Sequence, residues 1–413
     1  MKVLIIAHDV GSKEMGMLFR PYHIAQGLKS RGHEVEIITA SYSRVRRVNP
    51  SIENDLECSQ VEGIKYHWLK SLKFSGNSLQ RALGMFLFSF KLWWYSSYFA
   101  KILKADAVIA SSPHPFIIWG AHKIARKAGG NLFFEVRDIW PLSMGEIGGM
   151  HKKHPFYILC QMAEDYAYKN SKKVISLLPY AFEHMESRGL KKEKFVFIPN
   201  GFDDDFIKNR QSLAPELQTD LAHFKEKHCC LVGYVGAHGA ANSLESIITA
   251  FSLIPKESKI GLVLVGDGSE KKMLISKAEK LGLDNILFLN PVSKYQIPSV
   301  LDFIDIAYIG LKKSTVFKFG VSPNKLIDYM AMGKPILYAI DTERDPVSES
   351  NCGYKVPSDQ PDGLAKAIID VCSKPIDELH SKGQKGKDWV EKNISYSVLL
   401  TRMEDTLAGK HLT

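Results

Sequence analysis

The sequence predicts an α/β protein made of two doubly wound domains, each built on a mainly parallel sheet. Its 413 residues exceed what one hydrophobic core normally organises. Continuous apolar runs, such as residues 3–7 and 230–235, are typical of strands buried on both faces of a parallel sheet. In both halves of the chain these runs alternate with stretches of helical length and periodicity.

The first half of the chain alternates expected strands with expected helices. The strands are 3–7, 34–39, 107–110, 131–136, 173–178 and 195–198, and the helices include 20–30, 116–128 and 156–169. The loop 9–19 contains Gly11 and Gly16 but lacks the G-x-G-x-x-G dinucleotide fingerprint. Because this loop follows the first strand, it lies where open α/β sheets bind ligands, and Lys13 and Arg20 could meet an anion there. Alternatively, Arg20 only begins the helix and faces solvent.

Charge is unevenly distributed along the chain. Residues 1–200 hold 28 Lys/Arg against 17 Asp/Glu, a net +11, whereas the whole chain carries +9. A basic first half indicates an anionic partner, such as a membrane surface, a nucleic acid or a phosphorylated substrate, or serves solubility alone. No recognised nucleic-acid-binding motif accompanies the charge, so nucleic acid is the weakest of these.

Residues 41–75 are polar and contain the basic cluster 44–47, and the aromatic-rich segment 79–103 follows them. Lys91 interrupts this segment and Arg81, Lys101 and Lys104 flank it, so it is too broken to predict a transmembrane helix. Its composition fits a helix that lies on a membrane interface. It equally fits an amphipathic helix packed on the domain's sheet.

A polar pair follows the strand 131–136. Arg137 and Asp138 come at its carboxyl end, where they either bind acceptor hydroxyls or form a structural pair that fixes the loop. Six cysteines form neither a C-x-x-C pair nor a zinc pattern, which indicates reduced thiols of a cytosolic protein. The first residues run directly into a strand and lack the features of a signal peptide.

The second half repeats the alternation after a polar segment, 203–228, that is the expected linker. Expected strands are 230–235, 261–265, 286–289, 306–311 and 336–340, and a final helix is expected over 389–407. The loop 236–242 is rich in Gly and Ala, so its backbone N–H groups are accessible to a phosphate. Several strand ends converge on one edge of this sheet.

The stretch 317–335 predicts a nucleotide site. Ser322 is the expected N-cap and Pro323 the first helical residue, and Gly333 ends the helix. The helix N-terminus suits a phosphate, and Lys325 adds a full charge there. Asp328 lies about one turn (~5 Å) further on, where a ribose diol would lie. A capped surface helix whose Lys325 and Asp328 face water is the alternative interpretation.

Taken in order, several motifs resemble family-4 glycosyltransferases of the GT-B fold, in which two Rossmann-like domains face each other across a cleft. The resemblance covers nearly the whole chain and rests on residues 20–39, 197–203, 232–236, 264–268, 323–335 and the segment from Ser395. Residues 135–141 and 322–325 resemble the branch that builds bacterial O-antigen and capsule, including N-acetyl-L-fucosamine transferases. The expected domains are 1–202 and 229–394, with a helix about 395–413 packing back on the first.

The resemblance implies a metal-independent, retaining transfer from a UDP-sugar, without a cofactor, to a polyprenyl-pyrophosphate-linked saccharide. The implied place is the cytoplasmic face of the cell membrane, with an anionic membrane surface as a partner. Arg20, Arg137 and Asp138 are the implied acceptor contacts, and Asp138 and Lys325 the implied catalytic residues. The implied donor-binding residues are Gly11, Gly16, Gly236, His238, Gly239, Asn290, Val292, Ser322, Asn324, Lys325 and Asp328.

Two departures from the family pattern concern the donor. Asp328 matches the second acidic residue of the family's Glu-x7-Glu motif, but Gly320 stands where the first Glu is usual. The Arg and Lys that many members place after residues 232–236 are absent from 237–242, and Lys325 is the expected substitute.

Two other functions remain open. A UDP-sugar epimerase shares this architecture and needs carboxylates and a histidine that converge on the sugar ring. The residues available for this are Glu135, Asp138, His8 and His238. A non-catalytic partner of a transferase would only bind nucleotide or membrane.

Overall fold

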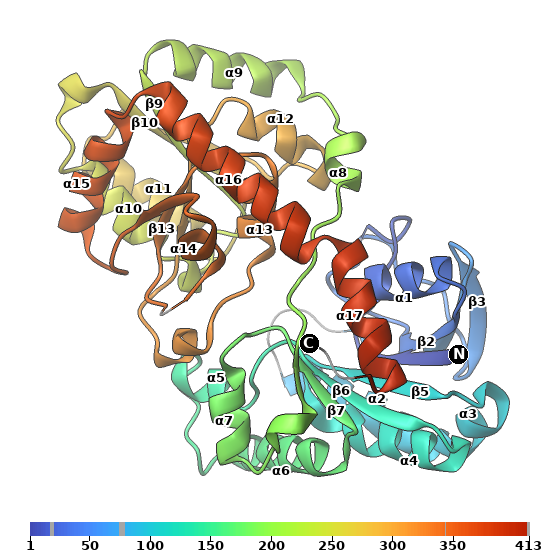
Figure 1. Cartoon of the computed structure of the whole chain (residues 1–413). Helices are drawn as coiled ribbons and strands as arrows, with labels where there is room; N and C mark the ends of the chain where they lie inside the picture. The colour runs from blue at the N-terminus through green and yellow to red at the C-terminus, as the bar shows by residue number, and fades with distance from the viewer. Residues whose placement is uncertain (17–19, 74–78, 343, 411–413) are drawn as a thin grey trace. The chain divides into compact units, whose positions relative to one another are not determined.

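The computed structural model describes residues 1–16, 20–73, 79–342 and 344–410 (Figure 1). The chain divides into two compact units, Met1–Asn200 with Tyr396–Thr413, and Gly201–Ser395. Residues 17–19 of the expected first loop and 411–413 of the expected last helix lie outside the described residues. Each unit contains one sheet with helices, as the α/β prediction requires.

The first unit has an eight-stranded sheet in the order β3-β4-β2-β1-β5-β6-β7-β8. Neighbouring strands are parallel except β3 and β4, which form an antiparallel hairpin. The strands are β1 (Lys2–Ile6), β2 (Glu34–Ala40), β3 (Glu57–Val61), β4 (Ile64–Leu69), β5 (Ala107–Ser111), β6 (Asn131–Val136), β7 (Lys173–Ser176) and β8 (Phe195–Phe197).

The β3–β4 hairpin lies within the polar segment 41–75, where no strand was expected. Strand β3 is at the sheet edge and exposes alternate residues, so its composition is polar. Its turn, Glu62 and Gly63, has φ values of 48° and 76°, as a two-residue hairpin turn requires. Among the described residues of this segment, positive φ values occur at Leu56, Glu62 and Gly63.

The helices of the first unit form two groups. Helix α4 contacts α2, α3 and α6, whereas α1 packs on α17. A Cβ on Gly27 would lie 2.2 Å from Leu400 Cδ1, so a larger residue there would force the Leu400 side chain to shift. The helices are α1 (Arg20–Ser30), α2 (Leu79–Trp94), α3 (Ser96–Leu103), α4 (Ile118–Ala128), α5 (Leu142–Glu146), α6 (Pro155–Asn170), α7 (Ala181–Ser187) and α17 (Tyr396–Ala408), with short 3-10 turns η1 (Pro115–Ile117) and η2 (Lys192–Lys194).

Two expected helices are each divided. The segment 79–103 breaks at Tyr95 into α2 and α3. The expected final helix over 389–407 breaks at Ser395, whose φ of −58° and ψ of 147° are extended. The part before Ser395 belongs to the second unit and the part after it to the first. Within the described residues, no helix combines the length and the apolar character needed to cross a membrane.

The second unit has a six-stranded, parallel sheet in the order β11-β10-β9-β12-β13-β14. Its strands are β9 (Cys230–Val235), β10 (Ile260–Val265), β11 (Ile286–Leu289), β12 (Ile306–Gly310), β13 (Ile336–Ala339) and β14 (Gly353–Lys355). Its helices are α8 (Asp205–Lys208), α9 (Pro215–Glu226), α10 (Leu244–Phe251), α11 (Lys271–Lys280), α12 (Ile297–Leu301), α13 (Asn324–Ala331), α14 (Pro346–Ser350), α15 (Pro361–Cys372) and α16 (Ile376–Ile394), with 3-10 turns η3 (Ala240–Asn242), η4 (Lys256–Ser258), η5 (Lys294–Gln296) and η6 (Thr315–Phe319).

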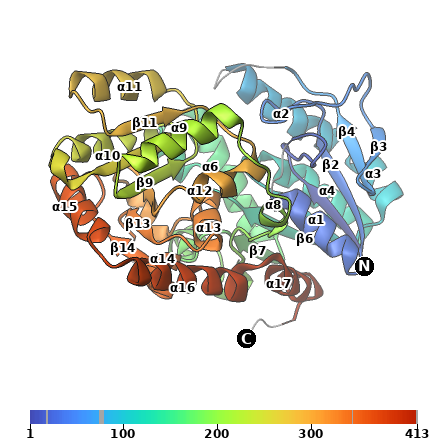
Figure 2. The same ribbon diagram turned by 90° about the horizontal axis from the view of Figure 1, so that it is seen from above.

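The segment 203–228 differs from the linker expected there. It contains α8 and α9 and belongs to the second unit, because Phe206 and Leu221 are buried in that unit's core. Helix α16 packs along α13 and α14 in the same unit (Figures 1 and 2). Gly383 allows this approach, since a Cβ there would lie 1.8 Å from the Gly333 carbonyl oxygen.

Candidate active site

The sheet of the second unit reverses its strand order between β9 and β12. From β9 the strands continue through β10 to β11, and from β12 they continue the other way through β13 to β14. In open α/β sheets, ligands bind in the crevice at the carboxyl ends of the strands beside such a reversal. The loop after β9 and the segment between β12 and α13 share this edge, so the residues they carry form the candidate site.

Lys325 joins the two segments. On the first turn of α13, its ammonium group donates to Tyr234 Oη at 2.5 Å and to Asn242 Oδ1 at 2.7 Å. Burial lowers the pKa of Lys325 to about 8. A Cβ on Gly236 would lie 3.3 Å from Lys325 Nζ, which places the bare backbone of the loop directly beside this cation. The structure thus brings together two residues that are 89 positions apart in the printed sequence.

The start of α13 differs from the expectation. The helix begins at Asn324, and its N-cap is Pro323 instead of Ser322. Pro323 cannot be the first helical residue because its ψ of 127° is extended. Proline has no side-chain group to cap the helix, and no side-chain cap hydrogen bond is formed there. The Ser322 capping prediction is therefore wrong, while its donor-binding role stays a prediction.

Gly320 has a backbone that explains its identity. Its φ of 96° and ψ of 172° lie in a region that only glycine readily adopts. Its N–H donates to the Phe317 carbonyl at 2.9 Å and ends the turn η6. A glutamate at this position would be strained, so the missing acidic residue follows from the local backbone geometry.

His238 is buried in the loop after β9. Its backbone N–H donates to Asp267 O at 2.8 Å, and its carbonyl accepts from Glu270 N at 3.0 Å. Neither ring nitrogen has a hydrogen-bond partner among the described residues. Burial, with help from Lys271, lowers the pKa of His238 to about 4, so the imidazole is neutral at pH 7. Gly239 next to it has an extended backbone.

Two glycines after β10 hold this loop in place. A Cβ on Gly266 would lie 1.9 Å from Gly236 O, and one on Gly268 would lie 2.4 Å from His238 O. Any larger residue would therefore push the loop after β9 away from the sheet edge. The sequence showed the Gly-Asp-Gly pattern, but only the fold shows which backbone it touches.

Lys271 is a site residue that sequence reasoning missed. Its ammonium group donates to Gly266 O at 2.8 Å, to Leu289 O at 2.9 Å and to Asn290 Oδ1 at 3.2 Å. It therefore ties the carboxyl ends of β10 and β11 together and fixes Asn290, one of the expected donor-binding residues. Its position three residues after the Gly-Asp-Gly turn was the available signal. Val292 is half-buried against the unit's core.

Asp328 is paired with another residue that the sequence did not single out. Lys294 Nζ lies 2.5 Å from Asp328 Oδ2 and 4.2 Å from the centre of the Phe206 ring. The Asp328 side chain is 13% exposed. Burial raises the pKa of Asp328, and the Lys294 charge opposes that shift. The carboxylate is thus held on the inner face of α13 and does not simply face water.

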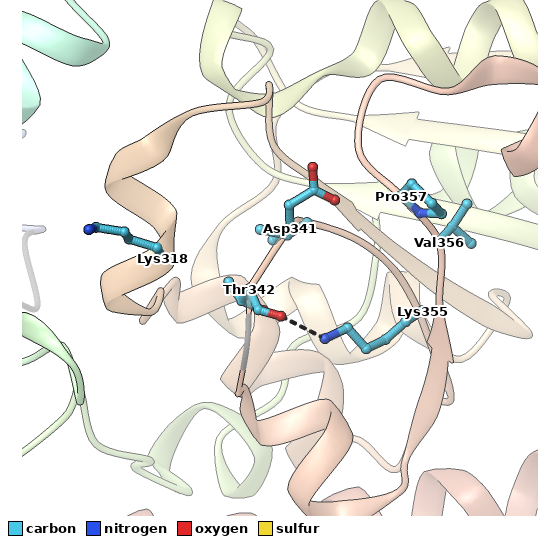
Figure 3. A pocket seen from close by; sticks show the side chains of 7 residues that line it. Lys318, Asp341, Thr342, Lys355, Val356 and Pro357 are labelled. Carbon is cyan, nitrogen blue, oxygen red and sulfur yellow. Dashed lines mark hydrogen bonds between the residues drawn. The ribbon is translucent and has the colours of Figure 1, made fainter.

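A hollow of about 440 Å³ lies further along the same sheet edge, at the ends of β13 and β14 (Figure 3). The Lys355 ammonium group donates to Thr342 O at 3.0 Å, as the dashed line shows. Asp341 accepts from the backbone N–H of Ser358 at 3.1 Å and from its hydroxyl at 2.7 Å. Because these polar groups already have partners within the protein, we assign no ligand to this hollow.

The first unit places its predicted residues around a buried ion pair. Arg20 Nε lies 2.7 Å from Glu135 Oε1, and their side chains are 2% and 3% exposed. Ser111 Oγ donates to Glu135 Oε2 at 2.6 Å, and a second Arg20 nitrogen donates to Pro199 O. Burial alone would raise the pKa of Glu135, but Arg20 and Ser111 lower it below its usual range. Arg20 thus links α1 to β5, β6 and the end of β8.

Arg137 and Asp138 have separate partners. The Arg137 side chain donates to Ser112 O at 3.3 Å, and burial lowers its pKa. Asp138 Oδ2 accepts from Trp140 Nε1 at 3.1 Å and from Ser143 Oγ at 3.0 Å. Burial raises the pKa of Asp138. Both residues therefore sit on the loop after β6, at the carboxyl edge of the first sheet.

The expected glycine loop of the first unit is described up to Gly16. Gly11 is buried, and its carbonyl accepts from Tyr66 Oη at 2.9 Å. Gly16 has a φ of 65°, and a Cβ there would lie 2.8 Å from Arg47 Cδ. These contacts fix the loop within its own unit. Its contact with a donor stays a prediction.

Among the described residues, no group of His, Cys, Asp or Glu side chains is arranged to hold a metal ion.

Comparison with known proteins shows which family of enzymes this chain belongs to. The family "Glycosyl transferases group 1" matches residues 222–389, and "Glycosyl transferase 4-like domain" matches residues 16–201. The two matches cover most of both units. The chain is a glycosyltransferase of the GT-B fold, and it belongs to the family-4 glycosyltransferases that combine these two domains.

Curated relatives and solved structures resemble nearly the whole chain. A probable glycosyltransferase WbjE of Pseudomonas aeruginosa is 22% identical over 86% of this chain and 84% of its own. A putative colanic acid biosynthesis glycosyl transferase WcaI of Escherichia coli K12 is 24% identical, over 81% and 82%. Anabaena HepE, crystallised with UDP and glucose, shares the fold with a TM-score of 0.66 at 15% identity, over 99% of both chains. WaaG, a glycosyltransferase involved in lipopolysaccharide biosynthesis, has a TM-score of 0.64 at 16% identity, over 98% of this chain and all of its own.

Proposed function

We propose that this enzyme transfers a sugar from a UDP-sugar to a lipid-linked saccharide during O-antigen or capsule synthesis, with retention of anomeric configuration and without a metal. The partly buried Lys325 between Gly236 and the N-terminus of α13 is the observation that carries this proposal. The names of WbjE, WcaI and WaaG support polysaccharide synthesis, and the UDP bound by HepE supports the donor class.

The donor diphosphate is proposed to bind at the start of α13. The first N–H groups of a helix and its partial positive charge favour an anion there. Lys325 adds a full charge that is already partly buried, and the bare backbone of Gly236 and Gly239 permits close approach of phosphate oxygens. Ser322 and Asn324 flank the same helix end and complete the proposed contact.

The nucleoside is proposed to extend from there towards β11. Asp328 would accept hydrogen bonds from the ribose hydroxyls, one helical turn (~5 Å) beyond the diphosphate. Its carboxylate is already oriented by Lys294. Asn290 and Val292, at the end of β11, would read the base. His238 is neutral and buried, so it fits a hydrogen bond to the donor better than a charge contact.

The chemistry needs a stabilised leaving group more than a protein nucleophile. The bond between the anomeric carbon and the diphosphate oxygen breaks, and an acceptor hydroxyl oxygen forms the new bond. Negative charge develops on the diphosphate, where Lys325 and the helix N-terminus stabilise it electrostatically. Asp138, with its pKa raised by burial, is proposed to contact the acceptor and handle the proton of its hydroxyl.

The first unit is proposed to hold the acceptor at the cytoplasmic face of the membrane. Arg20 and Arg137 would face its polar part. Helices α2 and α3 bury one side in the unit and expose apolar side chains on the other, including Leu79, Leu83, Phe90, Trp93, Trp94, Tyr98 and Ile102. The Lys123 ammonium group lies 3.8 Å from the centre of the Trp93 ring. Aromatic residues beside lysines suit the interface of an anionic membrane.

The test is a transfer assay with purified protein. Nucleotide sugars would be combined with polyprenyl-pyrophosphate-linked saccharides, and released nucleoside diphosphate would be measured. We expect release of UDP that depends on the acceptor and is abolished by Asp328→Ala. Conversion of the UDP-sugar without acceptor would indicate an epimerase instead. UDP binding without turnover for any pair would indicate a non-catalytic partner and contradict the proposal.

A further inference from the structure

The sheet of the first unit has its own reversal of strand order, between β1 and β5. From β1 the strands continue through β2 to β4, and from β5 they continue the other way to β8. His8 follows β1 and His114 follows β5, so the two histidines stand on either side of the crevice where such sheets bind ligands. Neither residue has a role in the contacts proposed above.

The two imidazole rings face each other in a buried, aromatic environment. Their centroids are 5.3 Å apart, and the residues are 2% and 1% exposed. Phe88 of α2 packs edge-on against His8 at 5.0 Å, and Phe116 lies 5.6 Å from His114. His8 Nδ1 is 3.3 Å from Asp9 Oδ2. None of the four ring nitrogens meets the geometry of a hydrogen bond with any described residue.

Burying polar groups without partners is costly. An unsatisfied buried donor or acceptor destabilises a fold, whereas phenylalanine would fill the same space without that penalty. At the carboxyl edge of the sheet, His8 Nε2 and both ring nitrogens of His114 therefore point to partners that come from outside the chain. The structure shows the same feature once more in the second unit, where His238 lies beside the proposed donor site.

The charge state of His114 indicates which kind of ligand this pair of histidines would bind. Burial, His8 and Arg81 lower the pKa of His114, and Asp9 opposes them, so His114 is neutral at pH 7. A neutral imidazole offers one donor and one acceptor, which matches a hydroxyl group. A phosphate offers acceptors only and prefers cationic donors. The chemistry of the His114 ring thus fits a sugar hydroxyl better than an anion.

We propose that His8 and His114 form the subsite that binds hydroxyl groups of the acceptor sugar. This inference rests on the proposed function and specifies which side chains recognise the acceptor within the first unit. Asp9 orients the His8 ring through its contact with Nδ1, which leaves Nε2 for the ligand. The two histidines are binding residues, and the transferred group forms no bond to either.

The test replaces each ring by one without nitrogen. His114→Phe and His8→Phe would be compared with wild type for transfer to a short-chain alkyl diphospho-N-acetylglucosamine. We expect the KM for this acceptor to rise at least tenfold, with the Kd for UDP changed less than twofold and Tm unchanged or higher. His114→Gln, which keeps a donor and an acceptor, should recover part of the affinity. His122→Phe is the matched control, because His122 already has a partner in Tyr166.

A second measurement separates this subsite from the proposed reaction. With 15N-histidine-labelled protein and no donor, the acceptor analogue should shift the imidazole resonances of His8 and His114. Such shifts without transfer from any donor would uphold the subsite and refute the proposed function. Unchanged resonances, or a His114→Phe variant that is more stable and keeps the wild-type KM, would overturn the subsite and show that the rings only pack.

Discussion

The two units place different chemistry at the same position of the same architecture. At the reversal in the second unit, glycines and the partly buried Lys325 leave backbone N–H groups and one cation at the sheet edge. At the reversal in the first unit, the buried imidazoles of His8 and His114 and the buried ion pair of Arg20 with Glu135 occupy the edge. We propose that the edge in the second unit binds a diphosphate and the edge in the first unit a hydroxylated ligand. The fold supplies two equivalent positions, and a few side chains decide what each receives.

The largest effect is expected from breaking the ion pair of the first unit. Arg20→Ala should lower the free energy of unfolding by about 3–5 kcal/mol, because it leaves the Glu135 carboxylate buried without its partner. The pKa of Glu135 is lowered in the folded state, so its contribution is present above pH 4.5 and is lost as pH falls. Urea unfolding of wild type and variant at pH 7 and pH 4 would measure the loss of unfolding free energy and its dependence on pH.

The exposed pair of Arg31 and Glu404 is the control for that substitution. Its side chains are each 26% exposed, so Arg31→Ala should cost at most about 1 kcal/mol. UDP affinity, which we assign to the second unit, should be unchanged in both variants. A weaker UDP affinity in Arg20→Ala would contradict the separation of roles between the units.

Removing the cation of the second unit should cost catalysis, not stability. Lys325→Ala should lower kcat about a hundredfold, or roughly 2.7 kcal/mol, since a preorganised donor at developing charge contributes about that much. Lys256→Ala changes a lysine that is 71% exposed in the same unit and should have no effect. Steady-state kinetics with the donor identified in the transfer assay would decide, and a kcat within threefold of wild type would exclude Lys325 from the mechanism.

The pH dependence of UDP binding offers a finer test. The pKa of Lys325 is lowered to about 8, so its charge is present below that value and is lost as pH rises through it. UDP affinity should therefore weaken between pH 7 and pH 9, by up to about tenfold per pH unit. Lys325→Arg stays charged throughout and should remove this dependence. Calorimetric titration of UDP into wild type and Lys325→Arg across this pH range would measure the dependence. If the affinity of both proteins falls equally with pH, another group is responsible for the loss.

The smallest effect concerns the membrane surface. Trp94 of α2 is 63% exposed, and Trp94→Glu should weaken binding to vesicles with 30% phosphatidylserine about fivefold, because a charge near an anionic surface is worth about 1 kcal/mol. Ile376 in the second unit is 54% exposed, and Ile376→Glu is the matched control. Vesicle sedimentation would compare them. Equal losses would mean that the exposed face of α2 has no special role.

Sequence reasoning worked where the physical signal was local. Parallel strands buried on both faces appear as continuous apolar runs, so β1, β6, β9 and β11 were located within a residue or two. Gly333, with a φ of 65°, ends α13 as predicted. The polar edge strand β3 gave no such run and was missed, and the fold alone shows that Ser395 divides the last helix between two units.

The sequence by itself determined the fold class, the family and the candidate residues Lys325, Asp328, Arg20 and Asp138, because periodicity and motif spacing are properties of the chain. Only the tertiary structure decided which of them meet. Lys294 pairs with Asp328 across 34 residues, and Gly266 supports Gly236 through a contact that no local pattern records. The close approach of the buried His8 and His114 rings is likewise visible only in the folded chain. Burial and hydrogen-bond partners arise from long-range packing, and a sequence pattern carries no distance between distant residues.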